Sequence, residues 1–285
     1  MVDQAVLLAG ICRYLTGRFA EAAAMGDDAR ASARDRHDPM AELWGLVLLA
    51  EARLRTEPED PALAGALAEG EALLQAGVPA IDTVRFRVAV ARHHLAAGRA
   101  DDAWRSIRTA AALAGPEPSF HPYTIEAHAG IPEVCLALLE RGGAPAAHPA
   151  QLRATATAGL RRLERYSRTF PIARPRARLC LGAWQALEGR RSAALRSWAR
   201  AVEVAERLAM PWELALGQLQ LGRHLGPGRA RPQRPRPGRP PGPGGGRVRG
   251  HRLPRRGRGP SAGPGHGRRP ARALTARGAS RTGTW

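Results

Sequence analysis

Apolar residues in the first 225 positions recur at intervals of three and four, and this spacing constrains the fold more than any other feature of the chain. One unbroken apolar stripe runs from Ala194 to Leu208, and residues 81–95 show the same spacing. Such spacing places apolar side chains on one face of an α-helix, whereas a half-buried strand needs strict alternation. The segment is also poor in β-branched and aromatic residues, which favours helices over strands.

Proline and glycine divide this segment into pieces of helical length. The expected fold class is therefore all-α, in a domain that covers residues 1–225. The predicted helices span residues 3–16, 18–36, 40–55, 61–76, 80–97, 99–114, 123–141, 148–169, 172–188, 191–209 and 211–224.

Three similar turns recur along the chain, at residues 15–22, 95–104 and 187–194. Each has a leucine followed by Gly-Arg, and their glycines (Gly17, Gly98 and Gly189) are 81 and 91 residues apart. Two units fit into each interval, so one unit holds about 40 to 46 residues, with the missing turns near 56–60 and 142–145. Because glycine ends one helix and lets the next fold back, the pattern predicts antiparallel helix pairs that stack on one another.

The clearest instance of this pattern is Leu187, Gly189, Ala194, Trp198 and Ala201, where small residues alternate with large ones. In this it resembles a tetratricopeptide-like repeat of the divergent class, because the unit is long and lacks a regular closing proline. The resemblance implies an α-solenoid of antiparallel helix pairs. It also implies that the first helices of the pairs line a concave surface that holds a protein or peptide.

Two segments, residues 170–176 and 205–213, resemble the C-terminal repeats of large bacterial signalling proteins. Those proteins join a nucleotide cyclase domain, an ATPase module and helical repeats, and the similarity covers about residues 170–225. Nothing in the chain resembles the cyclase or the ATPase. The resemblance therefore implies a regulatory protein-interaction module of a cytoplasmic signalling protein, either as a fragment or as a separate gene product.

Four residues of the predicted repeat surface are candidates for partner binding. Trp184 and Trp212 fall on predicted first helices, so the resemblance places them on the concave surface, where an exposed tryptophan anchors partners. Arg174 and Arg176, with Arg178, would add a surface for an acidic ligand. The alternative for the arginines is an ordinary solvated helix face.

Other large or sulfur-containing residues are expected in the core. Trp104 and Trp198 occupy equivalent positions of the repeat, which predicts packing between helix pairs. Cys12, Cys135 and Cys180 are widely spaced and odd in number, which is typical of small apolar core residues in a reducing cytoplasm. The longest apolar run, residues 43–50, is much shorter than the roughly 18 residues that a membrane span needs.

The residues that carry common catalytic chemistry do not form a site in the sequence. The chain has no lysine, which excludes a lysine-bearing phosphate loop, a Schiff base and a kinase-type lysine. His121 and His128 are seven residues apart, unlike the i, i+4 pair of zincins. Glu126 and Glu133 lie close to His128 and are expected as helix-surface charges rather than as partners of the imidazole. We therefore expect no enzymatic activity, cofactor or metal.

Residues 226–285 have a different composition from the rest of the chain. They hold 16 Arg, 15 Gly and 11 Pro with no Asp or Glu, so only +3 of the net charge of +19 belongs to the first 225 residues. Such a segment cannot bury enough apolar surface to fold, and we expect a disordered basic tail. Our leading hypothesis is out-of-frame translation of GC-rich DNA. The alternative is a genuine arm that binds nucleic acid weakly and non-specifically through its arginines.

The helix predicted at residues 211–224 is the first of a pair whose second member does not follow in the sequence. Its apolar face around Leu214, Leu219 and Leu221 is therefore expected to lie open. A patch of that kind promotes association. We expect the chain to be oligomeric or poorly soluble in sizing chromatography.

Overall fold

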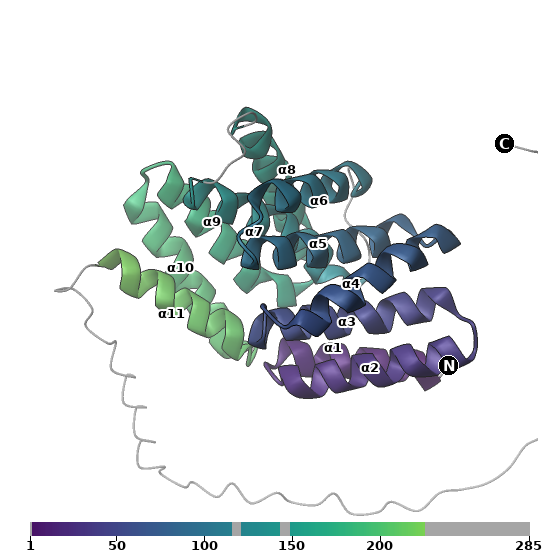
Figure 1. Cartoon of the computed structure of the whole chain (residues 1–285). Helices are drawn as coiled ribbons and strands as arrows, with labels where there is room; N and C mark the ends of the chain where they lie inside the picture. The colour runs from purple at the N-terminus through teal and green to yellow at the C-terminus, as the bar shows by residue number, and fades with distance from the viewer. Residues whose placement is uncertain (1, 116–120, 143–148, 226–285) are drawn as a thin grey trace, which may run out of the picture. The chain divides into compact units, whose positions relative to one another are not determined.

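The helices predicted from apolar spacing are all present in the computed structural model, which describes residues 2–115, 121–142 and 149–225 (Figure 1). All of these residues belong to one unit that spans residues 1–232, and none of them lies in a β-strand, which confirms the all-α class. The expectations for the tail fall on residues outside this description. The α-helices are α1 (Val2–Leu15), α2 (Phe19–Asp35), α3 (Pro39–Thr56), α4 (Pro61–Leu73), α5 (Ala80–Ala96), α6 (Ala100–Leu113), α7 (Ile125–Glu140), α8 (Pro149–Thr169), α9 (Arg174–Leu187), α10 (Arg191–Arg207) and α11 (Pro211–Leu225).

Three short 3-10 turns extend or precede these helices. They are η1 (Leu74–Ala76), η2 (Pro122–Thr124) and η3 (Pro171–Ala173). Each begins or ends beside an α-helix, as is common where a helix tightens at its ends.

Aspartate caps fix where α3 and α4 begin. The side chain of Asp38 accepts a hydrogen bond from the backbone N–H of Ala41 at 3.0 Å, and that of Asp60 accepts one from Ala62 at 2.9 Å. In both cases a proline follows at the first helical position. Each cap satisfies an otherwise unpaired N–H group and stabilises its helix by about 1 kcal/mol.

The recurrent glycine turns have the same backbone conformation. Gly17, Gly98 and Gly189 have φ angles of +79°, +73° and +72°, which an L side chain would strain. Each of these glycines separates two helices that pack against each other: α1 and α2, α5 and α6, and α9 and α10. The helices α7 and α8 also pack extensively on each other, as Figure 1 shows. The three glycine turns and the turn near residues 56–60, between α3 and α4, are therefore confirmed, whereas the turn expected near residues 142–145 lies largely outside the described residues.

The contact between α2 and α3 is the most extensive in the unit because two glycines face each other across it. A Cβ atom added at Gly26 would stand 2.8 Å from the carbonyl oxygen of Gly45, and one added at Gly45 would stand 2.6 Å from that of Gly26. The obstructing atoms belong to the backbone, which cannot rotate away. Only glycine at both positions allows the two helices to approach so closely.

Apolar side chains form four clusters between neighbouring helices, and the expected core tryptophans belong to the buried set. Trp104 and Trp198 are 4% and 1% exposed, which confirms their core position. Cys135 and Cys180 are buried too, and burial raises the pKa of the Cys135 thiol to about 12. Cys12 is exposed, so its assignment to the core was wrong. Ala9 and Arg13, on the same side of α1, are exposed as well, so this side of the helix faces solvent.

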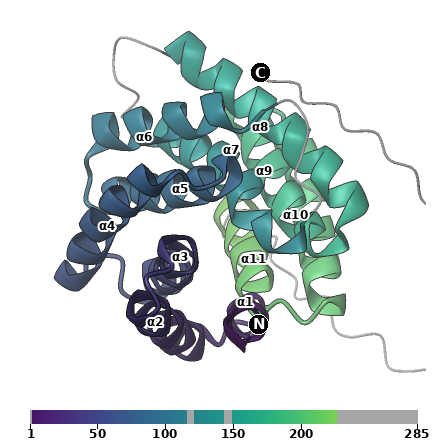
Figure 2. The same cartoon turned by 90° about the vertical axis from the view of Figure 1, so that its right-hand side faces the viewer.

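The beginning of α11 lies against the turn between α1 and α2, although the two are far apart in the sequence (Figure 2). The ring of Phe19, just after α1, meets the ring of Trp212 edge to face at a centroid distance of 5.4 Å. The Cγ of Pro211 stands 2.7 Å from the place of a Cβ on Gly17. The beginning and the end of the described helices are therefore in contact.

The apolar face expected on α11 is exposed in part. Leu219 is 45% exposed, whereas Leu214 and Leu221 are half-buried. The expected patch is therefore centred on one leucine and is smaller than the helical pattern indicated.

Candidate functional site

Arg176, one of the four predicted partner-binding residues, lies in the interior with 1% of its side chain exposed. It projects from α9 toward two carboxylates of α7. Its Nη1 donates to Oε1 of Glu126 at 2.8 Å, and its Nη2 donates to Oε2 of Glu133 at 2.6 Å. The two glutamates are seven residues apart and therefore lie on one face of α7, two turns from each other.

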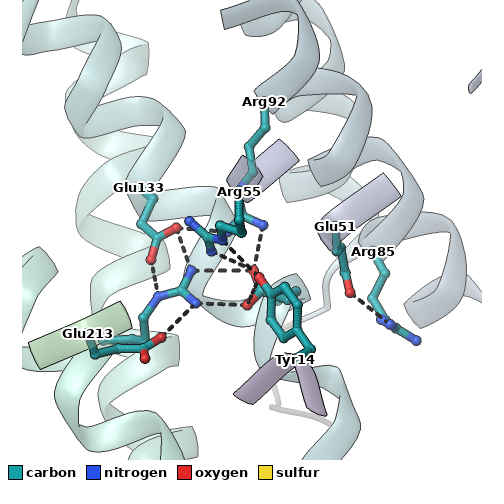
Figure 3. Close-up of polar contacts among 9 residues, drawn as sticks. Tyr14, Glu51, Arg55, Arg85, Arg92, Glu133 and Glu213 are labelled. Atoms are coloured by element: carbon teal, nitrogen blue, oxygen red, sulfur yellow. Dashed lines mark hydrogen bonds and ion pairs between the residues drawn. The ribbon is translucent and has the colours of Figure 1, made fainter. Parts of the chain in front are cut away.

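Four more helices contribute to this group of charges (Figure 3). Arg92 of α5 donates to Oε2 of Glu133 at 2.7 Å and also binds Glu126. Tyr14 of α1 donates to Glu126 at 2.9 Å and accepts a hydrogen bond from Arg55 of α3 at 3.0 Å. Glu213 of α11 lies 3.5 Å from Arg176. We call this set the buried charge network; it consists of Tyr14, Arg55, Arg92, Glu126, Glu133, Arg176 and Glu213.

The pKa values of the network show which carboxylates the arginines hold ionised. Burial alone would raise the pKa of Glu126, but the charges of Arg176, Arg92 and Arg55 outweigh it and hold that pKa well below its ordinary value. The pKa of Glu133 is lowered for the same reason. The pKa of Glu213 is raised, because its burial outweighs the charge of Arg176. Three arginines thus face two firmly ionised carboxylates and a third that protonates more readily.

The prediction that Glu126 is a surface charge was wrong, since Glu126 is 1% exposed. Glu133 is also drawn into the network, with a quarter of its side chain exposed. His128 contacts Tyr166 instead: the two rings are tilted by 32° with centroids 4.4 Å apart, and burial lowers the pKa of His128 to about 4. The sequence did contain a signal for the network, because Glu126 and Glu133 are carboxylates within a helix whose other residues are mostly apolar.

Trp212 joins α11 to the beginning of the chain. Its ring contacts Phe19, and the guanidinium of Arg55 lies over the same ring, 5.2 Å from the centroid. The tryptophan is half-buried. Its position is thus a junction between α11, α2 and α3 beside the buried charge network.

Trp184 and Arg174 come together in a groove on the other side of α9. The groove has a volume of about 600 Å³ and is bounded by α8 and α10, with α9 as its floor. We call it the arginine groove, because seven exposed arginines line it. They are Arg161, Arg168, Arg174, Arg178, Arg190, Arg200 and Arg207.

The charge of the groove is largely uncompensated. Only Arg168 and Arg200 form ion pairs within the described residues, and the other lining arginines form none: Arg161, Arg174, Arg178, Arg190 and Arg207. Glu164 is the one carboxylate among the lining side chains described, and it lies 3.5 Å from Arg168. The lining therefore carries a strong positive potential that focuses anions toward the groove.

Arg174 contributes to the groove from the start of α9. Its Nε donates to the backbone carbonyl of Ser167 at 3.3 Å, which positions the guanidinium without neutralising it. A carbonyl can orient an arginine but cannot cancel its charge. Arg174 therefore adds to the positive potential of the lining.

The floor of the groove is apolar. Leu160, Leu181 and Val204 line it together with Trp184. The guanidinium of Arg153 lies over the Trp184 ring at 5.8 Å. A second hollow, which ends at Glu188, shares Trp184 and Arg161 with the groove and continues it along α8. An extended ligand could thus lie across Trp184 from one hollow into the other.

Within residues 2–115, 121–142 and 149–225, no three His, Cys, Asp or Glu side chains are grouped as metal ligands. In the same ranges, no helix is both long and apolar enough to cross a membrane.

Comparisons of the chain with protein-family models, with curated proteins and with solved structures found no match. The resemblance to tetratricopeptide-like repeats and to cyclase–ATPase signalling proteins therefore stays a prediction from the sequence.

Proposed function

We propose that this protein is an interaction module that binds an acidic segment of a partner protein in the arginine groove. One observation carries the proposal: five exposed arginines that form no ion pair among the described residues border an apolar floor that contains Trp184. Arginine binds carboxylates through two parallel hydrogen bonds, and tryptophan and arginine are enriched at the energetic centres of interfaces. The groove offers both residue types to one ligand.

The inner side of the helix pairs is less suited to a partner. There, the arginines of the buried charge network are already bonded to glutamates, and Arg176 is almost fully buried. A partner would have to separate these pairs before it could use them, which is costly in a buried site. The proposed partner therefore lies between α8 and α10 rather than on the surface that the repeat resemblance implied.

The shape and composition of the groove favour a peptide over a single-stranded nucleic acid. A nucleic acid site needs several aromatic rings on which successive bases stack. The described lining has one, Trp184, among leucine, valine and alanine side chains. Acidic residues alternating with apolar ones would match this lining.

The proposal also covers the repeat class of the fold and the cellular context of the protein. We place the helix pairs in the divergent tetratricopeptide-like class, arranged as a solenoid, and the protein in cytoplasmic signalling. The recurrent glycine turns support the first part. The resemblance at residues 170–225 supports the second, and it overlaps α9 and α10, which supply most of the groove.

The test is fluorescence anisotropy of a short labelled peptide in which glutamate alternates with leucine. In the full chain, Arg161→Gln/Arg178→Gln should weaken binding about tenfold, as expected for two lost charge-assisted contacts. The matched control is Arg108→Gln/Arg223→Gln, which removes the same charge from exposed positions outside the groove. The control should leave the affinity nearly unchanged.

The control also distinguishes binding in the groove from binding to the basic residues 226–285, because all these variants retain that segment. Equal loss of affinity in both double variants would show that net charge alone attracts the peptide, and would contradict the proposal. So would a peptide with glutamine in place of glutamate that bound equally well. Tighter binding of a single-stranded oligonucleotide, sensitive to the groove variant, would assign the groove to nucleic acid instead.

A further inference from the structure

A cavity between α1, α3 and α5 has a lining unlike that of the arginine groove. Its volume is about 200 Å³, and Leu7, Leu8, Ile11 and Leu48 supply aliphatic walls. Trp44 and Tyr123 add aromatic ones, and Arg85 is the one charged side chain in the described lining. An apolar cavity of about 150 Å³ can hold benzene, so this one accommodates a ring with a small substituent.

Two buried donors of the lining lack an acceptor. Arg85 is 4% exposed and donates through Nη2 to Oε2 of Glu51 at 3.2 Å, as Figure 3 shows. Its Nε donates to no group in the described part of the chain, and neither does Nε1 of Trp44. A buried donor without an acceptor is costly, so a ligand that supplies one gains affinity.

The charges behind the lining exclude a fully anionic ligand. Arg85 interacts with Asp82, on the same helix, as well as with Glu51. Both carboxylates are buried, at 4% and 2% exposure. The guanidinium is thus already flanked by two acids, and a third carboxylate would meet repulsion from both.

From these observations we infer that the cavity is a binding site for a small, uncharged, ring-containing molecule that carries one hydrogen-bond acceptor, such as an aryl ketone. The ring lies between the aliphatic walls, and its carbonyl oxygen accepts from Arg85. The site is separate from the arginine groove, because the two share no lining residue. It would let the interaction module respond to a small molecule.

Ligand-detected fluorine NMR on the full chain tests this site with three probes that share a fluorinated ring. Para-fluoroacetophenone has the ring and the acceptor, fluorobenzene has the ring alone, and para-fluorobenzoate replaces the ketone by an anion. The ketone should bind about tenfold more tightly than fluorobenzene, as expected for one hydrogen bond from a charged donor. The benzoate should bind more weakly than the ketone.

A pair of tryptophan substitutions locates the binding. Leu8 lines the cavity yet is 50% exposed, so Leu8→Trp can fill the cavity without disturbing a packed core. Leu113→Trp is the control, because Leu113 is similarly exposed, at 42%, on α6. Ketone binding should be lost with Leu8→Trp and kept with Leu113→Trp.

Three results would overturn the inference. The first is absence of ketone binding to the full chain, and the second is retention of binding by Leu8→Trp. The third is tighter binding of the benzoate than of the ketone, which would show that the flanking carboxylates do not decide the ligand. None of these results depends on the outcome of the peptide experiment.

Discussion

The arginines of α9 lie in two different environments, although each is only two residues from the next. Arg176 is enclosed in the buried charge network, where its guanidinium bonds to two glutamates. Arg174 and Arg178 are exposed in the arginine groove, and Arg178 forms no ion pair among the described residues. Each residue advances about 100° around a helix, so a step of two turns the side chain to the opposite face, and a step of four returns it.

The comparison shows that residue type alone does not assign a role to a charge. Inside, arginine and glutamate are matched in number and hold six helices together: α1, α3, α5, α7, α9 and α11. In the groove, arginines outnumber carboxylates and remain available. The first arrangement stabilises the fold, and the second can bind a partner.

The sharpest test of this difference is removal of one arginine from each region. Arg176→Met should lower the free energy of unfolding by about 3–5 kcal/mol, because it leaves Glu126 and Glu133 buried with fewer partners. Arg178→Met should leave it nearly unchanged. Urea unfolding followed by circular dichroism measures both. Similar losses in the two variants would mean that the regions do not differ in kind.

A second contrast compares the two tryptophans that the sequence singled out. Trp212→Ala should destabilise the protein by about 2 kcal/mol, because it removes half-buried aromatic contacts with Phe19 and Arg55 that join α11 to the start of the chain. Trp184→Phe keeps a ring in the floor of the groove and should mainly weaken peptide binding. Thermal unfolding and peptide anisotropy on both variants separate the effects. If Trp212→Ala were as stable as the unchanged protein, the claim that Trp212 joins α11 to the start of the chain would be wrong.

The sequence was sufficient for the helices and insufficient for the network, for a physical reason. Helix positions follow from local spacing and from glycine and proline, so all eleven could be predicted. The network depends on which helices meet. Arg176 bonds across 50 residues to Glu126, and Tyr14 bonds to that glutamate across 112. No local pattern encodes those distances along the chain.

The candidate site shows the same division. A pattern could place Arg174, Arg176 and Arg178 on α9, but only the packing of α8 and α10 decides which of them faces a groove. Trp184 lines the groove, and its role in partner binding stays a prediction. Trp212 could not be distinguished from it, because its partner Phe19 is almost 200 residues away in sequence.

Acid should affect the interior and spare the groove. The pKa values of Glu126 and Glu133 are lowered in the folded protein, so their stabilisation is present above about pH 4.5 and is lost as the pH falls below it. The loss is at most about 1.4 kcal/mol per pH unit for each carboxylate. The raised pKa of Glu213 acts in the opposite sense: its contribution is present below about pH 4.5 and fades as the pH rises.

Urea unfolding at a series of pH values measures this dependence. Glu213→Gln should remove the loss of stability above about pH 4.5 and leave the rise below it nearly unchanged, because the raised pKa of Glu213 acts only above that pH. Arg178→Met should reproduce the curve of the unchanged protein, since Arg178 forms no ion pair with the carboxylates of the buried charge network, all of which lie in the described ranges. A flat curve below pH 4.5 would show that the glutamates are not held ionised by the arginines.

Salt should change the stability supplied by the buried charge network very little and should clearly weaken peptide binding in the arginine groove. Raising the salt concentration from about 0.1 M to about 1 M shortens the Debye length from about 10 Å to about 3 Å, which screens exposed charges much more than buried ones. The tenfold difference in peptide affinity between the Arg161→Gln/Arg178→Gln variant and its control should shrink to about twofold or less. The difference in stability between Arg176→Met and the unchanged protein should persist. A loss of that second difference at high salt would mean that solvent reaches the network, and the separation of the two regions would no longer hold.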